Sequence, residues 1–222
     1  MLGLPTKPAP PEWVTSETRK IRGLDLLGLR IPVERIGQTL LEAVTTISPT
    51  IRYLSLRAWI CRRYALARFP HSWKSFREFS ARIEAAAALG NLLVDRNTSG
   101  LVGFEEGQVK IDAGTGRIKL EPLVKQLAVS AYSGPSDALK LSFSDEHLEV
   151  PGLTAERGLA LAEAVEGLVK NTAFATKTAS DPNVALFNRE ELREFGEAFP
   201  IGRPDGAERQ ILISCLFSEK PA

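Results

Sequence analysis

The sequence TIRYLSLRAWICRRYALARFPHSWKSFR, residues 50–77, is the stretch on which the prediction of both fold and function depends. It lies in a longer segment that has no acidic side chain between Glu42 and Glu78, yet it carries six arginines and one lysine among six aromatic residues. Guanidinium groups pair with oxyanions, and flat rings offer stacking surfaces. This composition is therefore typical of a surface that binds a phosphate backbone or an acidic partner.

The same stretch predicts a helix over residues 50–69, capped by Thr50 and ended by Pro70. A turn of about 100° per residue places apolar side chains on several faces, so we expect burial on most sides. Such a helix cannot expose all its arginines together. Arg57 and Arg68 fall between apolar faces and are expected to hold the helix to the acidic half of the chain. The predicted nucleic-acid-binding residues are Arg52, Arg62, Arg63, Lys74 and Arg77.

Charge is divided unevenly along the chain. Residues 1–100 hold fifteen Lys/Arg against eight Asp/Glu and residues 101–222 hold thirteen against nineteen, so the halves carry about +7 and −6. Either the first half is a basic binding region, or the two halves attract each other across an internal interface. In the second case the arginines pair with carboxylates while their stems cover apolar groups. The sixfold excess of arginine over lysine in residues 50–77 favours binding.

Composition indicates a folded protein, because 44% of the 222 residues are hydrophobic and 25% are charged. Cys61 and Cys215 lie in apolar helical segments without the spacing of a disulfide framework or a zinc site. The N-terminus lacks the pattern of a signal peptide, and no run of about eighteen apolar residues occurs. We therefore expect a cytoplasmic location, no cofactor and no membrane contact.

The first half of the chain predicts a helical bundle. Four prolines in residues 1–12 indicate an extended arm. Apolar residues at helical spacing predict a helix over residues 32–46, and Ser72 opens another that ends near Asp95. Helices joined by short turns are expected to pack antiparallel, which makes residues 13–100 a bundle.

The second half predicts mixed structure. Residues 108–112 and 117–120 alternate around a glycine-containing turn and predict a β-hairpin, followed by a short helix over 123–132. Two strands over 139–143 and 147–150 precede a helix capped by Thr154. Residues 171–187 are polar and unpatterned. Two last helices are expected, one over 189–195 capped by Asn188 and one opened by a capping box of Asp205 and Glu208.

These elements predict a mainly α fold with small β elements, of the α+β class. The expected organisation is an arm (1–12), a helical bundle (13–100), a hairpin with an α+β segment (101–170), and a loop with C-terminal helices (171–222).

Two segments resemble known families. Residues 139–165 give two strands, a Leu153-Thr154-x-x-x-Gly158 turn and a helix, and this order resembles the wing and following helix of winged-helix proteins. Gly23-x-Asp25-x-Leu27-Gly28 and Thr50-x-Arg52-Tyr53-x-Ser55-x-x-x-Trp59 are similar to the start of an uncharacterised bacterial family whose genes lie among phage-defence and mobile-DNA genes. Members of the second family have no agreed activity; together with the arginine-rich stretch, the two resemblances favour a nucleic-acid-associated protein of bacterial genome defence.

Motifs for catalysis are sparse, so an enzyme is the less favoured interpretation. Asp112-Ala-Gly-Thr-Gly resembles the phosphate turn of actin-like and sugar-kinase ATPases, although a hairpin turn also explains its glycines. Glu105-Glu106 and the glutamates of residues 190–197 are typical of a solvated face. Neither histidine lies in a metal or nucleophile motif, and there is no Walker-type Gly-Lys-Ser/Thr.

The function favoured by the sequence is therefore a non-catalytic nucleic-acid-associated or adaptor component of a bacterial genome-defence or DNA-processing assembly. One alternative is a protein-interaction or oligomerisation module in which the basic helix is paired internally. A second is a hydrolase or nucleotide-using effector built around Asp112.

Overall fold

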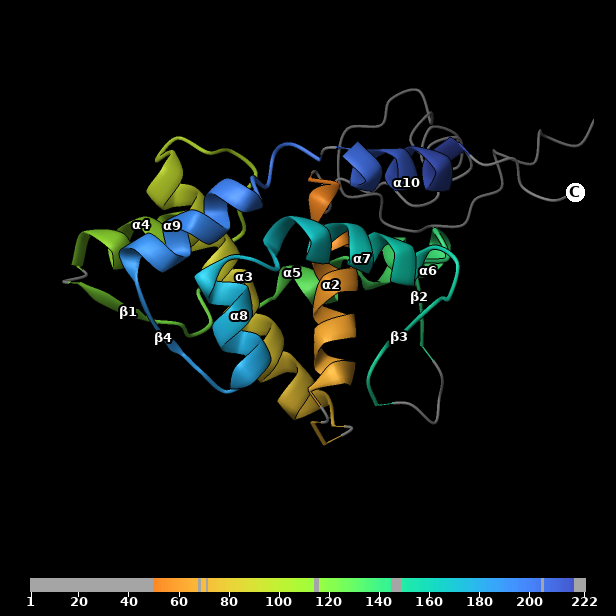
Figure 1. The fold of residues 1–222 in the computed structure, drawn as a ribbon, viewed down its shortest axis with the longest axis horizontal. Helices are drawn as coiled ribbons and strands as arrows, with labels where there is room; N and C mark the ends of the chain where they lie inside the picture. The colour runs from red at the N-terminus through yellow and green to blue at the C-terminus, as the bar shows by residue number, and fades with distance from the viewer. Residues whose placement is uncertain are drawn as a thin grey trace, which may run out of the picture. The chain divides into compact units, whose positions relative to one another are not determined.

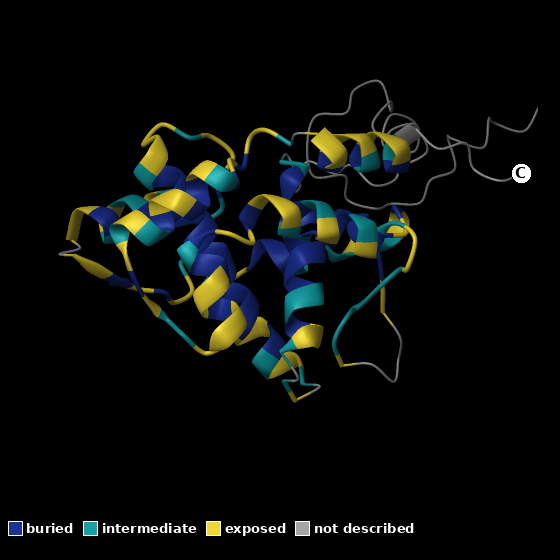
Figure 2. Ribbon diagram, viewed as in Figure 1, coloured by how far each residue is buried: buried dark blue, intermediate teal, exposed yellow. Residues whose placement is uncertain are grey.

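Helix α2 (Arg52–Leu66) lies among other helices in the computed structural model, which describes residues 50–67, 69–70, 72–113, 116–144, 149–204 and 206–217 (Figure 1). Eleven of its fifteen residues are buried, which confirms the predicted burial (Figure 2). The predicted cap is wrong, because Ile51 holds the N-cap position without a side-chain bond. The Thr50 hydroxyl instead donates to the carbonyl of Gly100 at 3.1 Å.

Helix α3 (Trp73–Val94) begins as predicted, since the Ser72 hydroxyl accepts from the backbone N–H of Ser75 at 3.2 Å. It packs beside α2 and more extensively against α9 (Arg189–Ala198). The predicted helix over 32–46 and the arm over 1–12 lie outside the described residues.

The predicted hairpin is wrong. Its first half belongs to helix α4 (Phe104–Ala113), and strand β1 (Arg117–Lys119) pairs antiparallel with the distant β4 (Leu186–Asn188). Within α4, Val109 is 69% exposed and Ile111 is buried, whereas in a strand both would share a face. The apparent alternation was one turn of an amphipathic helix packed on α3.

The segment after β1 contains two short helices, α5 (Ala128–Ala131) and α6 (Ser133–Ala138), where one was predicted. Strands β2 (Ser142–Phe143) and β3 (Gly152–Leu153) then form an antiparallel pair before helix α7 (Gly158–Val169). This order of strand, strand and helix was predicted, although the second strand lies later than expected. Its interpretation as a winged helix stays a prediction.

Thr154 was predicted to cap α7, but the N-cap position belongs to Arg157. The Thr154 hydroxyl still accepts from the N–H of Gly158 at 3.0 Å and so supports the first residue of the helix. Gly158 is required there, because a Cβ would collide with the carbonyl of Leu141.

Residues 171–187 are more regular than predicted, because they contain helix α8 (Ala173–Ser180), capped by Thr172. Helix α9 is confirmed and extends to Ala198, with a capping box between Asn188 and Glu191. Helix α10 (Gly206–Phe217) ends the described chain. The predicted cap Asp205 lies outside the described residues.

One hydrophobic cluster draws on residues from Tyr53 to Cys215, so the described parts of the chain share a single core within the compact unit 41–222. Helices α7 and α9 cover one side of α2 and α3, and α5 and α4 contact these same two helices (Figure 1). The described structure is mostly helical with small antiparallel strands, which confirms the α+β class. None of its helices combines the length and apolar character that a membrane span requires.

Candidate functional site

Arg52 was predicted to bind nucleic acid, and this prediction is wrong because only 1% of the residue is exposed. Its Nε and Nη2 atoms donate to the Glu208 carboxylate, with the Nη2 to Oε2 distance at 2.7 Å. Its Nη1 donates to the carbonyls of Pro200 and Arg203, and the guanidinium lies 4.2 Å from the ring centre of Phe199. Arg52 thus joins α2 to α10 and offers nothing to a partner.

Arg62 and Arg63 also bind within the chain. Arg63 forms two bonds to Glu166, from Nε at 2.8 Å and from Nη2 at 2.7 Å, and its guanidinium lies 5.2 Å from the ring centre of Trp59. The indole N–H of Trp59 donates to the same carboxylate at 2.7 Å. Arg62 pairs with Glu163 at 3.2 Å in a more exposed setting. The pairs join the basic helix α2 to the acidic helix α7.

Arg57 was expected to hold the bundle to the acidic half of the chain. It is buried, and its Nη1 donates to a backbone carbonyl of that half, that of Val129. Arg68 lies outside the described residues.

Lys74 and Arg77 differ from the other predicted site residues, because both are exposed and neither has a carboxylate within ion-pair distance in the described structure. Arg77 donates from Nη2 to the carbonyl of Lys125 at 2.9 Å, which brings a third exposed cation to this surface. Trp73 precedes Lys74, is 45% exposed and lies 5.6 Å from Phe76 between ring centres. We call Trp73, Lys74, Arg77 and Lys125 the α3 corner.

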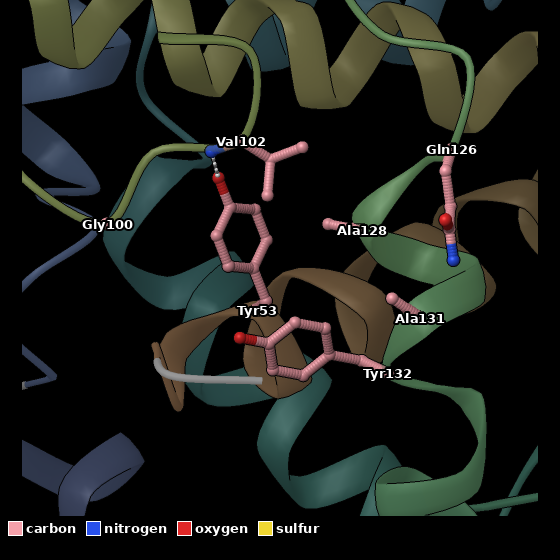
Figure 3. A pocket seen from close by; sticks show the side chains of 7 residues that line it. All are labelled: Tyr53, Gly100, Val102, Gln126, Ala128, Ala131 and Tyr132. Carbon is pink, nitrogen blue, oxygen red and sulfur yellow. Dashed lines mark hydrogen bonds between the residues drawn. The ribbon is translucent and has the colours of Figure 1, made fainter. Parts of the chain in front are cut away.

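A pocket of about 190 Å³ lies beside α2 (Figure 3). The rings of Tyr53 and Tyr132 meet there with their centres 5.4 Å apart. Tyr53 accepts from the N–H of Val102 at 2.8 Å, and Tyr132 accepts from the N–H of Thr50 at 3.1 Å. Burial raises the pKa of both phenols, so they stay protonated at neutral pH. The pocket, which we call the tyrosine pocket, is lined by Tyr53, Gly100, Val102, Gln126, Ala128, Ala131 and Tyr132.

Glu84 of α3 fixes one wall of the tyrosine pocket. Its buried carboxylate accepts the N–H of Ala128 at 2.8 Å and that of Val129 at 2.6 Å, at the start of α5. Burial raises the pKa of Glu84 to about 7, although these two bonds and the nearby Arg57 act in the opposite direction. The start of α5 is therefore held by two buried side chains, the Glu84 carboxyl group and Arg57, whose Nη1 donates to the carbonyl of Val129.

Comparison with protein-family models, with curated proteins and with solved structures finds no match to this chain. Function is therefore inferred from the geometry of the α3 corner and the tyrosine pocket.

The acidic residues that the sequence offered as catalytic or metal-binding candidates do not come together as a site in the described residues. Asp112 is 59% exposed and pairs with Arg96 at 2.8 Å. Glu191 belongs to the cap of α9 and pairs with Lys177. Across the described ranges no three His, Cys, Asp or Glu side chains come together as metal ligands.

The tyrosine pocket and Glu84 were missed by the sequence reasoning. Tyr53 and Tyr132 are far apart in the chain, and nothing in their spacing predicts that they meet. Glu84 had a visible signal, because it is the single acid in an otherwise apolar and small-residue stretch of α3.

Proposed function

We propose that the chain is a non-catalytic nucleic-acid-associated component that contacts single strands through the α3 corner. The observation that supports this is the exposed pair Lys74 and Arg77, left without carboxylate partners in the described structure beside the exposed ring of Trp73. In this proposal the arginines of α2 serve the fold. The resemblance of the N-terminal motifs to a defence-associated bacterial family suggests a genome-defence or DNA-processing assembly as its setting.

Single strands suit this surface better than duplexes. An indole ring can stack on an unpaired base, and base–aromatic stacking contributes about 1–3 kcal/mol per base. The three cations then meet the backbone on either side of the stacked base. A duplex keeps its bases stacked inside, so it could contact the cations of the α3 corner but could not stack a base on Trp73.

The test is binding of labelled single-stranded DNA and RNA and of duplex DNA across a salt series. Affinity for single strands should fall with salt, with a log–log slope of about −0.7 for each phosphate contacted. Replacing Lys74 and Arg77 by alanine should flatten that slope, and Trp73→Ala should weaken binding about tenfold. Lys170→Ala, at an exposed lysine after α7, is the matched control. It removes one positive charge and should leave the affinity and the salt slope almost unchanged. Absent binding, or binding insensitive to salt, would refute the proposal.

A second candidate is the protein-interaction or oligomerisation module. The internal pairing of Arg52 and Arg63 favours it, together with Leu66, which is 67% exposed at the end of α2. Leu66 borders a groove of about 150 Å³ between α2, α3 and α8. Self-association through this apolar surface should persist at high salt, in contrast to nucleic-acid binding. Sedimentation velocity over a range of concentrations tests it, with Leu66→Ser as the variant that should abolish association.

A further inference from the structure

The tyrosine pocket has the size of one aromatic ring. At about 190 Å³ it is somewhat larger than an engineered cavity of about 150 Å³ that admits benzene, and smaller than the roughly 300 Å³ at which pockets for whole ligands begin. A six-membered ring fits within it, while a sugar and a phosphate would have to remain outside.

The walls of the pocket suit a flat ring that carries carbonyl oxygens. Tyr53 and Tyr132 supply aromatic surface, and Ala128 and Ala131 supply methyl groups that leave space between them (Figure 3). Each tyrosine hydroxyl already accepts a backbone N–H, so its own hydrogen remains available to an acceptor. The exposed amide of Gln126 adds a donor and an acceptor at the rim.

The rim of the pocket is continuous with the α3 corner. Lys125 directly precedes Gln126, and the guanidinium of Arg77 is bound to the Lys125 carbonyl. Arg77 and Lys125, both exposed, therefore lie next to a residue that lines the pocket, and they are cations available to the phosphate of a bound nucleotide. Ala128 and Ala131 of α5, which follow Gln126 in the chain, line the pocket as well, and Glu84 holds the start of α5 through two backbone bonds (Figure 3).

We propose that the tyrosine pocket binds a single pyrimidine base whose phosphate lies against Arg77 and Lys125. This inference rests on the proposed function, since it names the base that the single strand inserts next to the α3 corner. A pyrimidine such as thymine or uracil is favoured because its ring carries carbonyl oxygens that can accept the tyrosine hydrogens, whereas adenine carries none. The same chemistry is present in a free pyrimidine nucleotide and in a base of a strand.

The experiment measures the affinity of the whole chain for oligothymidylate and oligoadenylate by fluorescence anisotropy, with UMP, AMP and inorganic phosphate as competitors. Oligothymidylate should bind about tenfold more tightly than oligoadenylate. Displacement by UMP but not by AMP or phosphate would assign the pocket to free nucleotides as well. If only strands bind, the pocket takes a base held in a chain.

Two variants separate the pocket from the surface beside it. Ala131→Leu fills the pocket and should remove the pyrimidine preference, and Gln126→Ala, at an exposed side chain, should reduce it. Ala138→Leu, at an exposed alanine of α6, is the matched control and should keep the preference. Thermal melting checks that each variant is folded.

The outcomes are distinguishable from failure of the proposed function. If no strand binds at all, both proposals fail. If strands bind in a manner that depends on Lys74 and Trp73 but show no pyrimidine preference, or keep it in both Ala131→Leu and Gln126→Ala, the pocket inference alone is overturned.

Discussion

At the scale of single residues, the most consequential group is the buried carboxyl of Glu84. It lies between α3 and α5, faces Arg57 and Tyr53, and accepts two backbone N–H groups. The balance between burial and these partners places its pKa near 7, which is within the physiological range. A side chain that only filled the core would not respond to pH in this way.

We predict that stability falls as pH rises from about 5 to 7. Because burial raises the folded-state pKa of Glu84 from 4.5 to about 7, the folded protein holds a proton that the unfolded chain has already released. The free energy of unfolding should therefore decrease over this window, by up to about 3 kcal/mol from this group. Glu84→Gln removes the titration and should flatten the profile. Urea denaturation at several pH values measures both, and an equally steep profile in the variant would contradict the assignment.

At the scale of elements, packing of α3 on α9 depends on two glycines that face each other. A Cβ on Gly196 would collide with the backbone of Gly90, and a Cβ on Gly90 would collide with the backbone of α9. The helices consequently approach backbone to backbone, and Trp59 and Phe195 stack nearby with ring centres 5.9 Å apart.

Gly196→Ala should lower stability by about 2–3 kcal/mol, because the added methyl has no space and the helices must separate. Gly167 of α7 provides the matched control, since nothing lies within 4 Å of the position that its added methyl group would take. Gly167→Ala should raise stability by about 0.5–1 kcal/mol, as alanine favours a helix over glycine. Chemical denaturation of the two variants gives the comparison, and similar effects in both would show that the crossing is not as close as described.

The elements also show how far sequence reasoning reaches. Helix starts with a local cap were predicted, as at Ser72 and Asn188, because the capping bonds join residues three apart. The pairing of β1 with β4 was not predicted, because it joins two segments that are separated by most of the second half of the chain. Within the candidate site, Lys74 and Arg77 could be predicted as site residues from the basic, acid-free composition of the stretch that contains them. Arg52 was predicted to be an exposed binding residue, because nothing near it in the sequence indicates that Glu208 is its partner.

At the scale of the whole molecule, the uneven charge of the two halves is used internally. Arg52 and Arg63 of the basic half bind Glu208 and Glu166 of the acidic half. The Arg52 pair is the most buried of these, with about 1% of each side chain exposed. It fastens α10, the last described helix, to the start of α2.

Removing Glu208 should therefore loosen α10 and destabilise the whole described fold. Glu208→Ala leaves the Arg52 guanidinium buried without a counter-charge, which costs about 3–5 kcal/mol. The exposed pair of Arg193 and Glu197 is the control, and Glu197→Ala should cost less than about 0.5 kcal/mol.

The thiol of Cys215 on α10 reports the local effect, because burial in the native protein protects it and raises its pKa. Its labelling should accelerate in Glu208→Ala under native conditions more than that of Cys61. If the two thiols instead keep their original rates, α10 is held by its contact with α7 and the ion pair is dispensable.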